Sequence, residues 1–377
     1  MTYADPATAP NRGTELQLVS PVCSREYGER MSAASREAIV PSLAAMYQTF
    51  FPIGAAVEPE TLVSQSDLLV TQVSSLVAEN AMKWERIHPA RGNNLSSYAF
   101  AGADAIVAFA RDHGMKVRGH TLVWHNQVPA WVFQGDAGPV TKSELLSRLR
   151  GHINTLLAHF QGEVYCWDVV NEAISERAGE WRTDSPWHRL AGSYHGGDGI
   201  PGYIERAFEY ARAADPAARL FYNDYGIETG AKLERALRLM KILKAKGLVD
   251  GVGIQGHWTV FGPDAETVRR AIQSFASLGV EVQITELDVS LYRSGDTSAL
   301  REPRADLLSR QAEMYGSYFR VFREEAQARR LTGVTFWGIA DDHTWLDSFP
   351  VKGRKDWPLL FDIHHRPKDA FWTAATW

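Results

Sequence analysis

Residues 164–173 read VYCWDVVNEA. The run begins as a β-prone, mostly apolar segment and ends in an amide, Asn171, beside a carboxylate, Glu172. A single ending of this kind is explained by an ordinary turn, because Asn is common in turns and Glu is common in the first turn of a helix. The ending becomes informative only if other predicted strands of the chain finish in the same way.

Seven further apolar runs predict strands, and they alternate with predicted helices. The predicted strands cover 51–57, 75–83, 116–122, 164–170, 219–223, 251–255, 280–285 and 332–337, and the predicted helices cover 61–77, 98–111, 141–160, 203–214, 231–246, 263–278, 304–329 and 368–373. This alternation predicts an α/β fold, and eight strands predict a closed (β/α)8 TIM barrel. An open doubly wound sheet is the alternative, but residues 51–60 lack the glycine-rich phosphate loop that such sheets often carry.

The composition is that of a globular protein, with 45% hydrophobic and 23% charged residues among 377. Residues 1–40 show little periodicity and are predicted to be an N-terminal extension of a single catalytic domain, 41–377. A net charge of −5 and the lack of a basic tract argue against nucleic acid as a partner. Two cysteines give no disulfide framework. No obligate protein partner is implied.

No secretory signal and no membrane-spanning segment are evident. The expected location is therefore the cytoplasm. The alternative is a secreted protein whose signal has been removed from this sequence.

Polar side chains close seven of the eight predicted strands. They are Glu79-Asn80 and Lys83, His120 and Trp124-His125-Asn126, Asn171-Glu172, Asn223-Asp224-Tyr225, Gln255 and His257-Trp258, Glu286 and Asp288, and Trp337-Gly338. The carboxyl ends of barrel strands meet at one rim, where barrel enzymes place their active sites. The repetition therefore favours an active site over a set of unrelated turns. Several of the chain's 12 tryptophans lie among these polar residues and suggest platforms for flat ligand faces.

Other chemistries have weaker support. We find no P-loop and no GxSxG nucleophile motif. His120 and His125 are five residues apart at a strand end, which is a poor match to a helical zinc-binding pair. No metal or cofactor is expected, although a His/Asp/Glu metal site at the rim stays an alternative.

Glu172 and Glu286 follow the fourth and seventh strands, so their side chains face one another across the barrel mouth. Two carboxyl groups about 5 Å apart are the requirement for retaining cleavage of a glycosidic bond. His257 and Asp288 lie near Glu286 and would favour its ionised, nucleophilic form. Glu172 then becomes the acid/base, with its proton affinity raised by burial and by the opposing negative charge. A packed histidine that caps a loop is the alternative for His257.

The chain resembles glycoside hydrolase family 10, the endo-β-1,4-xylanases. The matching segments, in order, are IGAAV, AENAMKWE, RGHTLVWHNQVPAW, WDVVNEA, LFYNDY, GIQGHW, ITELDV, TFWGIADDHTWL and PLLFD. The resemblance implies a (β/α)8 barrel and retaining hydrolysis of internal bonds in xylan or xylo-oligosaccharides, through a covalent glycosyl-enzyme and without metal or cofactor.

The resemblance also implies residue roles. Glu172 matches the acid/base, Glu286 matches the nucleophile, and His257 with Asp288 matches the network around the nucleophile. Tyr225 matches the aromatic platform on the aglycone side. The residues that match the glycone subsites are Glu79, Asn80, Lys83, His120, Trp124, Asn171, Gln255, Trp337 and Trp345. For Lys83 and Glu79, a surface ion pair of little energetic value is the alternative.

Besides the extension before residue 40, which matches no part of the family pattern, two features depart from it. Gly226 stands where the family often has Asn, and residues 191–201 are longer and richer in glycine than usual. The second departure predicts a changed aglycone side. Two other functions remain as alternatives: a β-1,4-glycosidase of the same family that acts on short xylo- or cello-oligosaccharides, and a sugar-binding barrel without activity.

Overall fold

The computed structural model describes residues 40–92, 94–177, 179–192 and 199–376. The predicted extension, 1–40, lies outside these residues except for Val40. Most of the glycine-rich segment 191–201 lies outside them as well.

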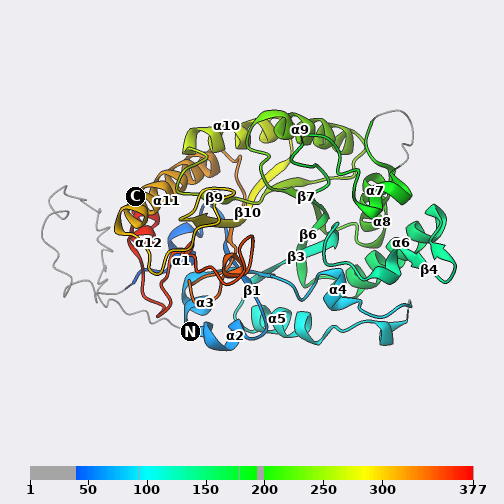
Figure 1. Cartoon of the computed structure of the whole chain (residues 1–377), viewed down its shortest axis with the longest axis horizontal. Coiled ribbons are helices and arrows are strands. Elements are labelled where there is room, and N and C mark those ends of the chain that lie inside the picture. The colour runs from blue at the N-terminus through cyan, green and yellow to red at the C-terminus, as the bar shows by residue number, and fades with distance from the viewer. Residues whose placement is uncertain (1–39, 93, 178, 193–198, 377) are drawn as a thin grey trace, which may run out of the picture. The chain divides into compact units, whose positions relative to one another are not determined.

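Eight parallel strands form a closed barrel, which confirms the predicted fold (Figure 1). Closure is seen in strand β11, which pairs with β1 on one side and with β10 on the other. The barrel strands are β1 (Ile53–Val57), β2 (Ser75–Ala78), β3 (Lys116–Val123), β6 (Val164–Asn171), β7 (Arg219–Asp224), β8 (Gly251–Ile254), β10 (Glu281–Ser290) and β11 (Val334–Phe336). Parallel strands in a closed ring bring all their carboxyl ends to one rim.

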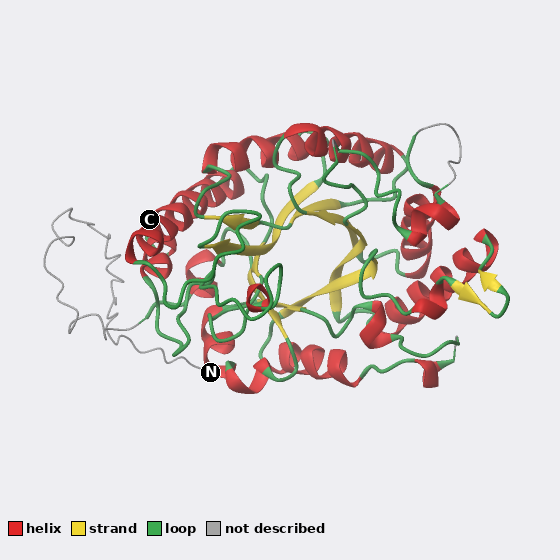
Figure 2. Ribbon diagram, viewed as in Figure 1, coloured by secondary structure: helices red, strands yellow, loops and turns green. Residues whose placement is uncertain are grey.

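Helices surround the ring of strands, as Figure 2 shows. They are α1 (Leu43–Tyr47), α2 (Thr61–Ser64), α3 (Ser66–Gln72), α4 (Trp84–Ile87), α5 (Ala101–Asp112), α6 (Lys142–His159), α7 (Pro186–Ala191), α8 (Gly202–Ala214), α9 (Gly230–Ala245), α10 (Ala265–Ala276), α11 (Ala305–Gln327) and α12 (Asp369–Ala374). Helix α6 begins as predicted, because the Thr141 hydroxyl accepts a hydrogen bond from the Glu144 N–H. None of the helices among the described residues is long and apolar enough to cross a membrane.

Two differences from the sequence prediction concern the strands of the main sheet. The predicted helix 61–77 is two short helices, α2 and α3, and its last residues belong to β2. Pairing of β2 with both β1 and β3 outweighs the local helical pattern. An extra strand, β9 (His257–Thr259), follows β8 and pairs with the far end of β10.

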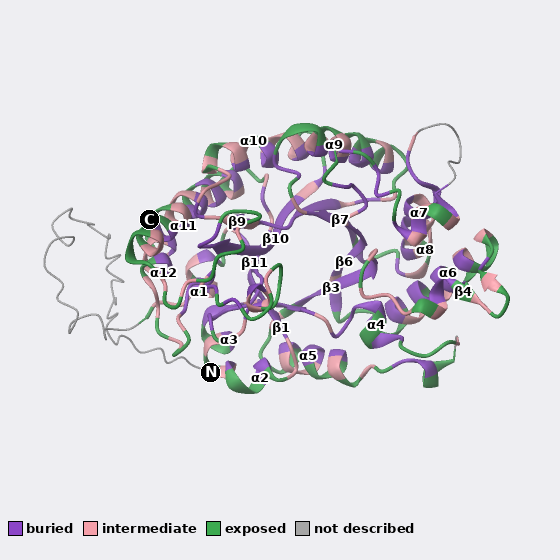
Figure 3. Cartoon of the chain, viewed as in Figure 1, coloured by how far each residue is buried: buried purple, intermediate pink, exposed green. Residues whose placement is uncertain are grey.

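The barrel strands are buried almost throughout, whereas the outer faces of the helices are exposed (Figure 3). Side chains fill the inside of the barrel, and strand glycines make room for them. A Cβ atom at Gly253 would lie 2.2 Å from Asn223 Oδ1, and one at Gly251 would lie 2.3 Å from the ring of Phe221. These close approaches exclude any larger residue unless its neighbour moves.

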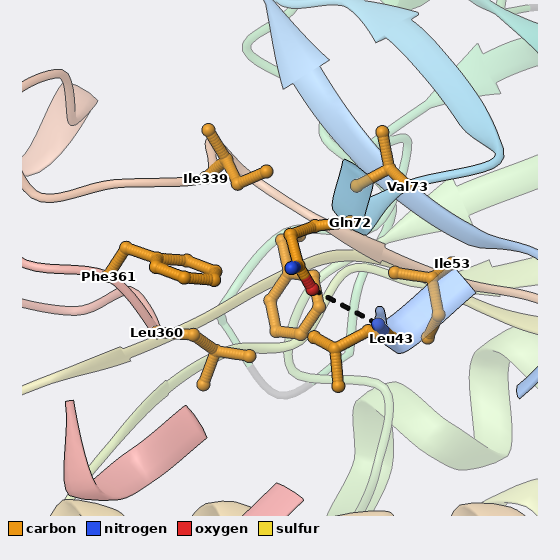
Figure 4. Close-up of a pocket in the computed structure, with 8 residues that line it drawn as sticks. Leu43, Ile53, Gln72, Val73, Ile339, Leu360 and Phe361 are labelled. Atoms are coloured by element: carbon orange, nitrogen blue, oxygen red, sulfur yellow. Dashed lines mark hydrogen bonds between the residues drawn. The ribbon is translucent and has the colours of Figure 1, made fainter. Parts of the chain in front are cut away.

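A small cavity lies beside α1 (Figure 4). Its volume is about 10 Å³, close to the space that one water molecule needs. Its walls are apolar except for Gln72, whose Oε1 already accepts a hydrogen bond from the Leu43 N–H at 3.1 Å. We therefore regard this cavity as a packing feature of the barrel wall.

Candidate active site

The carboxyl ends of the barrel strands surround an open cleft of about 620 Å³. Every site residue predicted from the sequence lines this cleft except Asp288, which contacts the lining residue His257 from behind. The predicted residues in the lining are Glu79, Asn80, Lys83, His120, Trp124, Asn171, Glu172, Tyr225, Gln255, His257, Glu286, Trp337 and Trp345. The structure thus brings together side chains from seven barrel strands and the segments that follow them.

Glu172 directly follows β6 and has a backbone φ of 56°, in the left-handed region. This conformation is uncommon for a residue with a side chain. Its carboxyl group accepts hydrogen bonds from Trp124 Nε1 at 2.8 Å and from Gln255 Nε2 at 3.0 Å. Both donors are neutral, so the contacts orient the carboxyl group without placing a full positive charge on it.

Glu286 lies near the middle of β10 and is held by a different set of donors. Its Oε2 atom lies 3.0 Å from His257 Nε2, and its Oε1 atom accepts a hydrogen bond from Asn223 Nδ2 at 2.7 Å. Burial by itself raises the pKa of Glu286, but the hydrogen bond from His257, the electrostatic effects of His120 and His257 and the hydrogen bond from Asn223 outweigh burial. They lower the pKa to about 2, so the group is ionised at neutral pH.

His257 lies between two carboxylates because β9 pairs with β10 in a register that sets it opposite Asp288. Its Nδ1 atom is 2.9 Å from Asp288 Oδ2, which also accepts a hydrogen bond from Trp345 Nε1. Burial by itself lowers the pKa of His257, but the charge of Asp288 and the hydrogen bonds to both carboxylates raise it to about 10. The ring is therefore a cation at neutral pH and donates a hydrogen bond to each partner.

A row of amides joins the two glutamates across the cleft. Asn223, which donates to Glu286, lies 2.9 Å from the Asn171 side chain. Gln255 lies 3.1 Å from the same Asn171 side chain and donates to Glu172. Both carboxyl groups therefore face one cleft, with amides between them that can bond to sugar hydroxyls.

Lys83 and Glu79 do not form the ion pair considered from the sequence. Glu79 lies 2.9 Å from His343 Nε2, while Lys83 Nζ donates to Asn80 Oδ1 at 3.1 Å and lies 4.8 Å from the centre of the Trp124 ring. Burial lowers the pKa of Lys83, opposed by the charges of nearby carboxylates, of which Glu286 acts most strongly. This cation is buried within the cleft and is not part of the solvent-exposed surface.

Tyr225 lines the same cleft as Glu172. The conformation of the next residue, Gly226, explains why Gly can stand where the family often has Asn. Gly226 has a φ of 65°, in the left-handed region that suits both Gly and Asn. The exchange of Asn for Gly at this position therefore preserves the turn. The Tyr225 ring packs on the amine of Lys232 at 3.6 Å, and its hydroxyl accepts a hydrogen bond from Arg182.

Sequence reasoning missed several residues of the cleft and its supports. Asn223 stood in a predicted strand end but was not singled out, although its amide contacts Glu286. Arg182, His343 and Phe349 come from segments that no strand-end pattern marks. Phe349 is 60% exposed and stacks on Trp345, and its position four residues after Trp345 was its only signal in the sequence.

The part of the chain that the structure describes contains no group of three or more His, Cys, Asp or Glu side chains arranged to hold a metal ion.

A closed (β/α)8 barrel that holds two glutamates over an open cleft, among Trp, amide and His side chains, defines a glycoside hydrolase of the TIM-barrel class. The family model described as glycosyl hydrolase family 10 matches residues 42–376, and the chain belongs to that family. It is an endo-1,4-β-xylanase.

Known relatives agree with this assignment. A β-1,4-xylanase of Dictyoglomus thermophilum is 47% identical over 335 residues, which are 88% of this chain and 90% of that protein. A mutant solved in complex with xylotriose is 43% identical, covers 90% of this chain and 100% of its own, and has a TM-score of 0.83. An intracellular xylanase of Thermoanaerobacterium saccharolyticum is 40% identical, covers 89% and 99%, and has a TM-score of 0.77.

Proposed function

We propose that this xylanase cleaves internal bonds of xylan or xylo-oligosaccharides with retention, using Glu286 as the nucleophile and Glu172 as the acid/base. One observation carries the proposal: the His257 cation lies between Asp288 and Glu286 and keeps Glu286 ionised. The nucleophile of this reaction must be a carboxylate that stays ionised although it is buried. The related structure with bound xylotriose supports the substrate class.

The reaction proceeds in two displacements. In the first, a Glu286 oxygen bonds to the anomeric carbon as the glycosidic bond breaks, and Glu172 transfers its proton to the departing oxygen. In the second, Glu172 accepts a proton from water as the water oxygen replaces Glu286 at the anomeric carbon. Both glutamates return to their starting protonation states, and no other reactant is required.

The remaining lining residues hold the sugar chain in this proposal. The flat faces of the xylose rings pack on Trp337 and Trp345 on one side of the reacting bond and on Tyr225 on the other. Asn171 bonds to the 2-hydroxyl of the reacting sugar, a contact that strengthens in the transition state. Further hydroxyls bond to Glu79, Asn80, Lys83, His120, Trp124 and Gln255.

The acid/base role is tested by Glu172→Gln. The variant keeps the shape of the side chain but has no proton to donate, so hydrolysis of xylan falls by roughly 10²–10⁴. The value of kcat/KM for dinitrophenyl xylobioside falls far less, because dinitrophenolate leaves without protonation. A matched loss on both substrates would contradict the role. For the nucleophile, Glu286→Ala is expected to abolish activity on both.

We infer that the enzyme acts inside the cell, and the related intracellular xylanase supports this location. Fractionation of the native cells tests the inference. Xylanase activity should remain with the cytosolic fraction, and activity in the culture medium would contradict it.

A further inference from the structure

The backbone of Glu172 is held in an unfavourable conformation by its surroundings. Left-handed φ values are uncommon for residues other than Gly, and such a residue persists only where neighbours fix it. At this position the conformation determines where the carboxyl group points. The groups that fix the peptide therefore bear on the chemistry of the side chain.

Three hydrogen bonds fix this peptide. The Glu172 N–H donates to the Asn223 carbonyl at 2.9 Å, which continues the pairing of β6 with β7. The Glu172 carbonyl accepts from Arg182 Nε at 3.0 Å, and the next N–H, of Ala173, donates to the Tyr222 hydroxyl at 3.2 Å. The first bond is ordinary strand pairing, whereas the other two come from side chains.

The Tyr222 hydroxyl is itself oriented. It is fully buried and donates its proton to Asp224, so a lone pair remains for the Ala173 N–H. Asp224 is held in turn by Lys232 Nζ at 2.7 Å. The hydroxyl is thus a fixed acceptor, and none of these bonds involves Glu286.

Arg182 connects the same peptide to the aglycone side of the cleft. Its guanidinium is mostly buried, and beyond the Glu172 carbonyl it donates to the Tyr225 hydroxyl at 3.2 Å. It also reaches the Ile174 carbonyl at 3.4 Å and Glu176 Oε1 at 3.5 Å. One rigid group therefore contacts both the acid/base peptide and the ring proposed to hold the leaving sugar.

We propose that Tyr222 and Arg182 are positioning residues for proton transfer: they hold the Glu172 peptide in its left-handed conformation and thereby aim the carboxyl group at the departing oxygen. This inference rests on the proposed acid/base role of Glu172. Loss of either contact lets the peptide relax and displaces the proton donor. Glu286 keeps its own donors, so the nucleophile is unaffected.

Tyr222→Phe tests the proposal, because it removes one hydroxyl and keeps the ring. The measurement is kcat/KM for aryl xylobiosides with poor and good leaving groups. A misplaced donor costs roughly 10–100-fold with a poor leaving group and little with dinitrophenol. Tyr47→Phe is the matched control, since it also removes a buried hydroxyl, which donates to the Ala374 carbonyl at 2.6 Å, far from the cleft. For the control, any loss in kcat/KM relative to the wild-type enzyme should be the same with poor and good leaving groups.

Arg182→Lys provides an independent variant if Tyr222→Phe does not fold. An amine keeps the charge but lacks the planar fork, in which Nε donates to the Glu172 carbonyl and Nη2 donates to the Tyr225 hydroxyl. The same dependence on the leaving group is expected.

A double variant separates positioning from general damage. If Tyr222 acts through Glu172, adding Tyr222→Phe to Glu172→Gln costs little further activity on xylan. The proposal would be overturned if the losses of activity in the double variant were additive. It would also be overturned if Tyr222→Phe and Arg182→Lys each lowered kcat/KM equally with poor and good leaving groups. If Glu172→Gln alone showed no dependence on the leaving group, the acid/base assignment itself would be the part that fails.

Discussion

At the scale of single residues, the two glutamates differ in the groups that donate hydrogen bonds to them. Neutral groups, Trp124 and Gln255, donate to Glu172. A cation, His257, donates to Glu286 and is itself held by Asp288. The donors to Glu286 keep it ionised, whereas the donors to Glu172 only orient its carboxyl group. Retaining hydrolysis requires two carboxyl groups that differ in this way.

The charge of Glu286 is predicted to depend on His257. In the variant His257→Asn the cation is lost, and burial together with the Asp288 charge then raises the pKa of Glu286 from about 2. Because the nucleophile must be ionised, the acidic limb of the kcat/KM profile moves upward, by about 1–3 pH units. The profile is measured with dinitrophenyl xylobioside, whose leaving group needs no acid.

His343→Ala is the control for this shift. It removes a histidine that supports the lining residue Glu79 and is not hydrogen-bonded to Glu286. Its acidic limb should coincide with that of the wild-type enzyme. An unmoved limb in His257→Asn would show that His257 does not set the charge of the nucleophile.

At the scale of elements, strand register assembles the site. Pairing of β9 with β10 sets His257 opposite Asp288, and pairing of β6 with β7 sets Asn171 opposite Asn223. Strand β8 contributes to the site because one of its residues, Gly253, has no side chain. Gly253 leaves room for the Asn223 side chain, whose Nδ2 donates to Glu286.

Gly253→Ala is therefore predicted to impair both stability and activity. The added Cβ would lie 2.2 Å from Asn223 Oδ1, and overpacking of this kind costs about 1–3 kcal/mol in the free energy of unfolding. Because the amide is displaced from Glu286, kcat/KM falls as well. Thermal unfolding and kinetics on xylo-oligosaccharides measure the two effects.

Gly251→Ala in the same strand separates the effect on stability from the effect on activity. There the Cβ would lie 2.3 Å from the Phe221 ring, which packs against the buried guanidinium of Arg118. This variant should lose stability to a similar degree but keep most of its kcat/KM. If both variants lost activity equally, the effect on Asn223 would not be specific.

The elements also show how far the sequence alone could lead. The eight-fold alternation predicted the barrel, because each strand and helix carries a local pattern. Strand β9 was not predicted, since three residues carry no periodicity of their own and its partner is the far end of β10. Arg182 was missed for a related reason: its contacts with Glu172 and Tyr225 exist only once the chain has folded.

At the scale of the whole molecule, we propose that residues 41–377 form one catalytic domain and that 1–40 are an extension of it. The family match over residues 42–376 supports this division. Deletion of residues 1–39 is expected to leave kcat/KM on xylan and the midpoint of thermal unfolding unchanged. A fall in either quantity would show that the first 39 residues belong to the working domain.

The ion cluster of Glu286, His257 and Asp288 has a further consequence for the medium in which the enzyme can work. Its one cation lies 2.9 Å and 3.0 Å from two carboxylates, so one negative charge remains, but the protein largely shields the cluster from mobile ions. Dissolved salt screens exposed pairs, such as Arg91 with Asp136, far more than buried ones. An unbranched xylo-oligosaccharide carries no charge that salt could screen, so turnover is expected to be nearly independent of ionic strength.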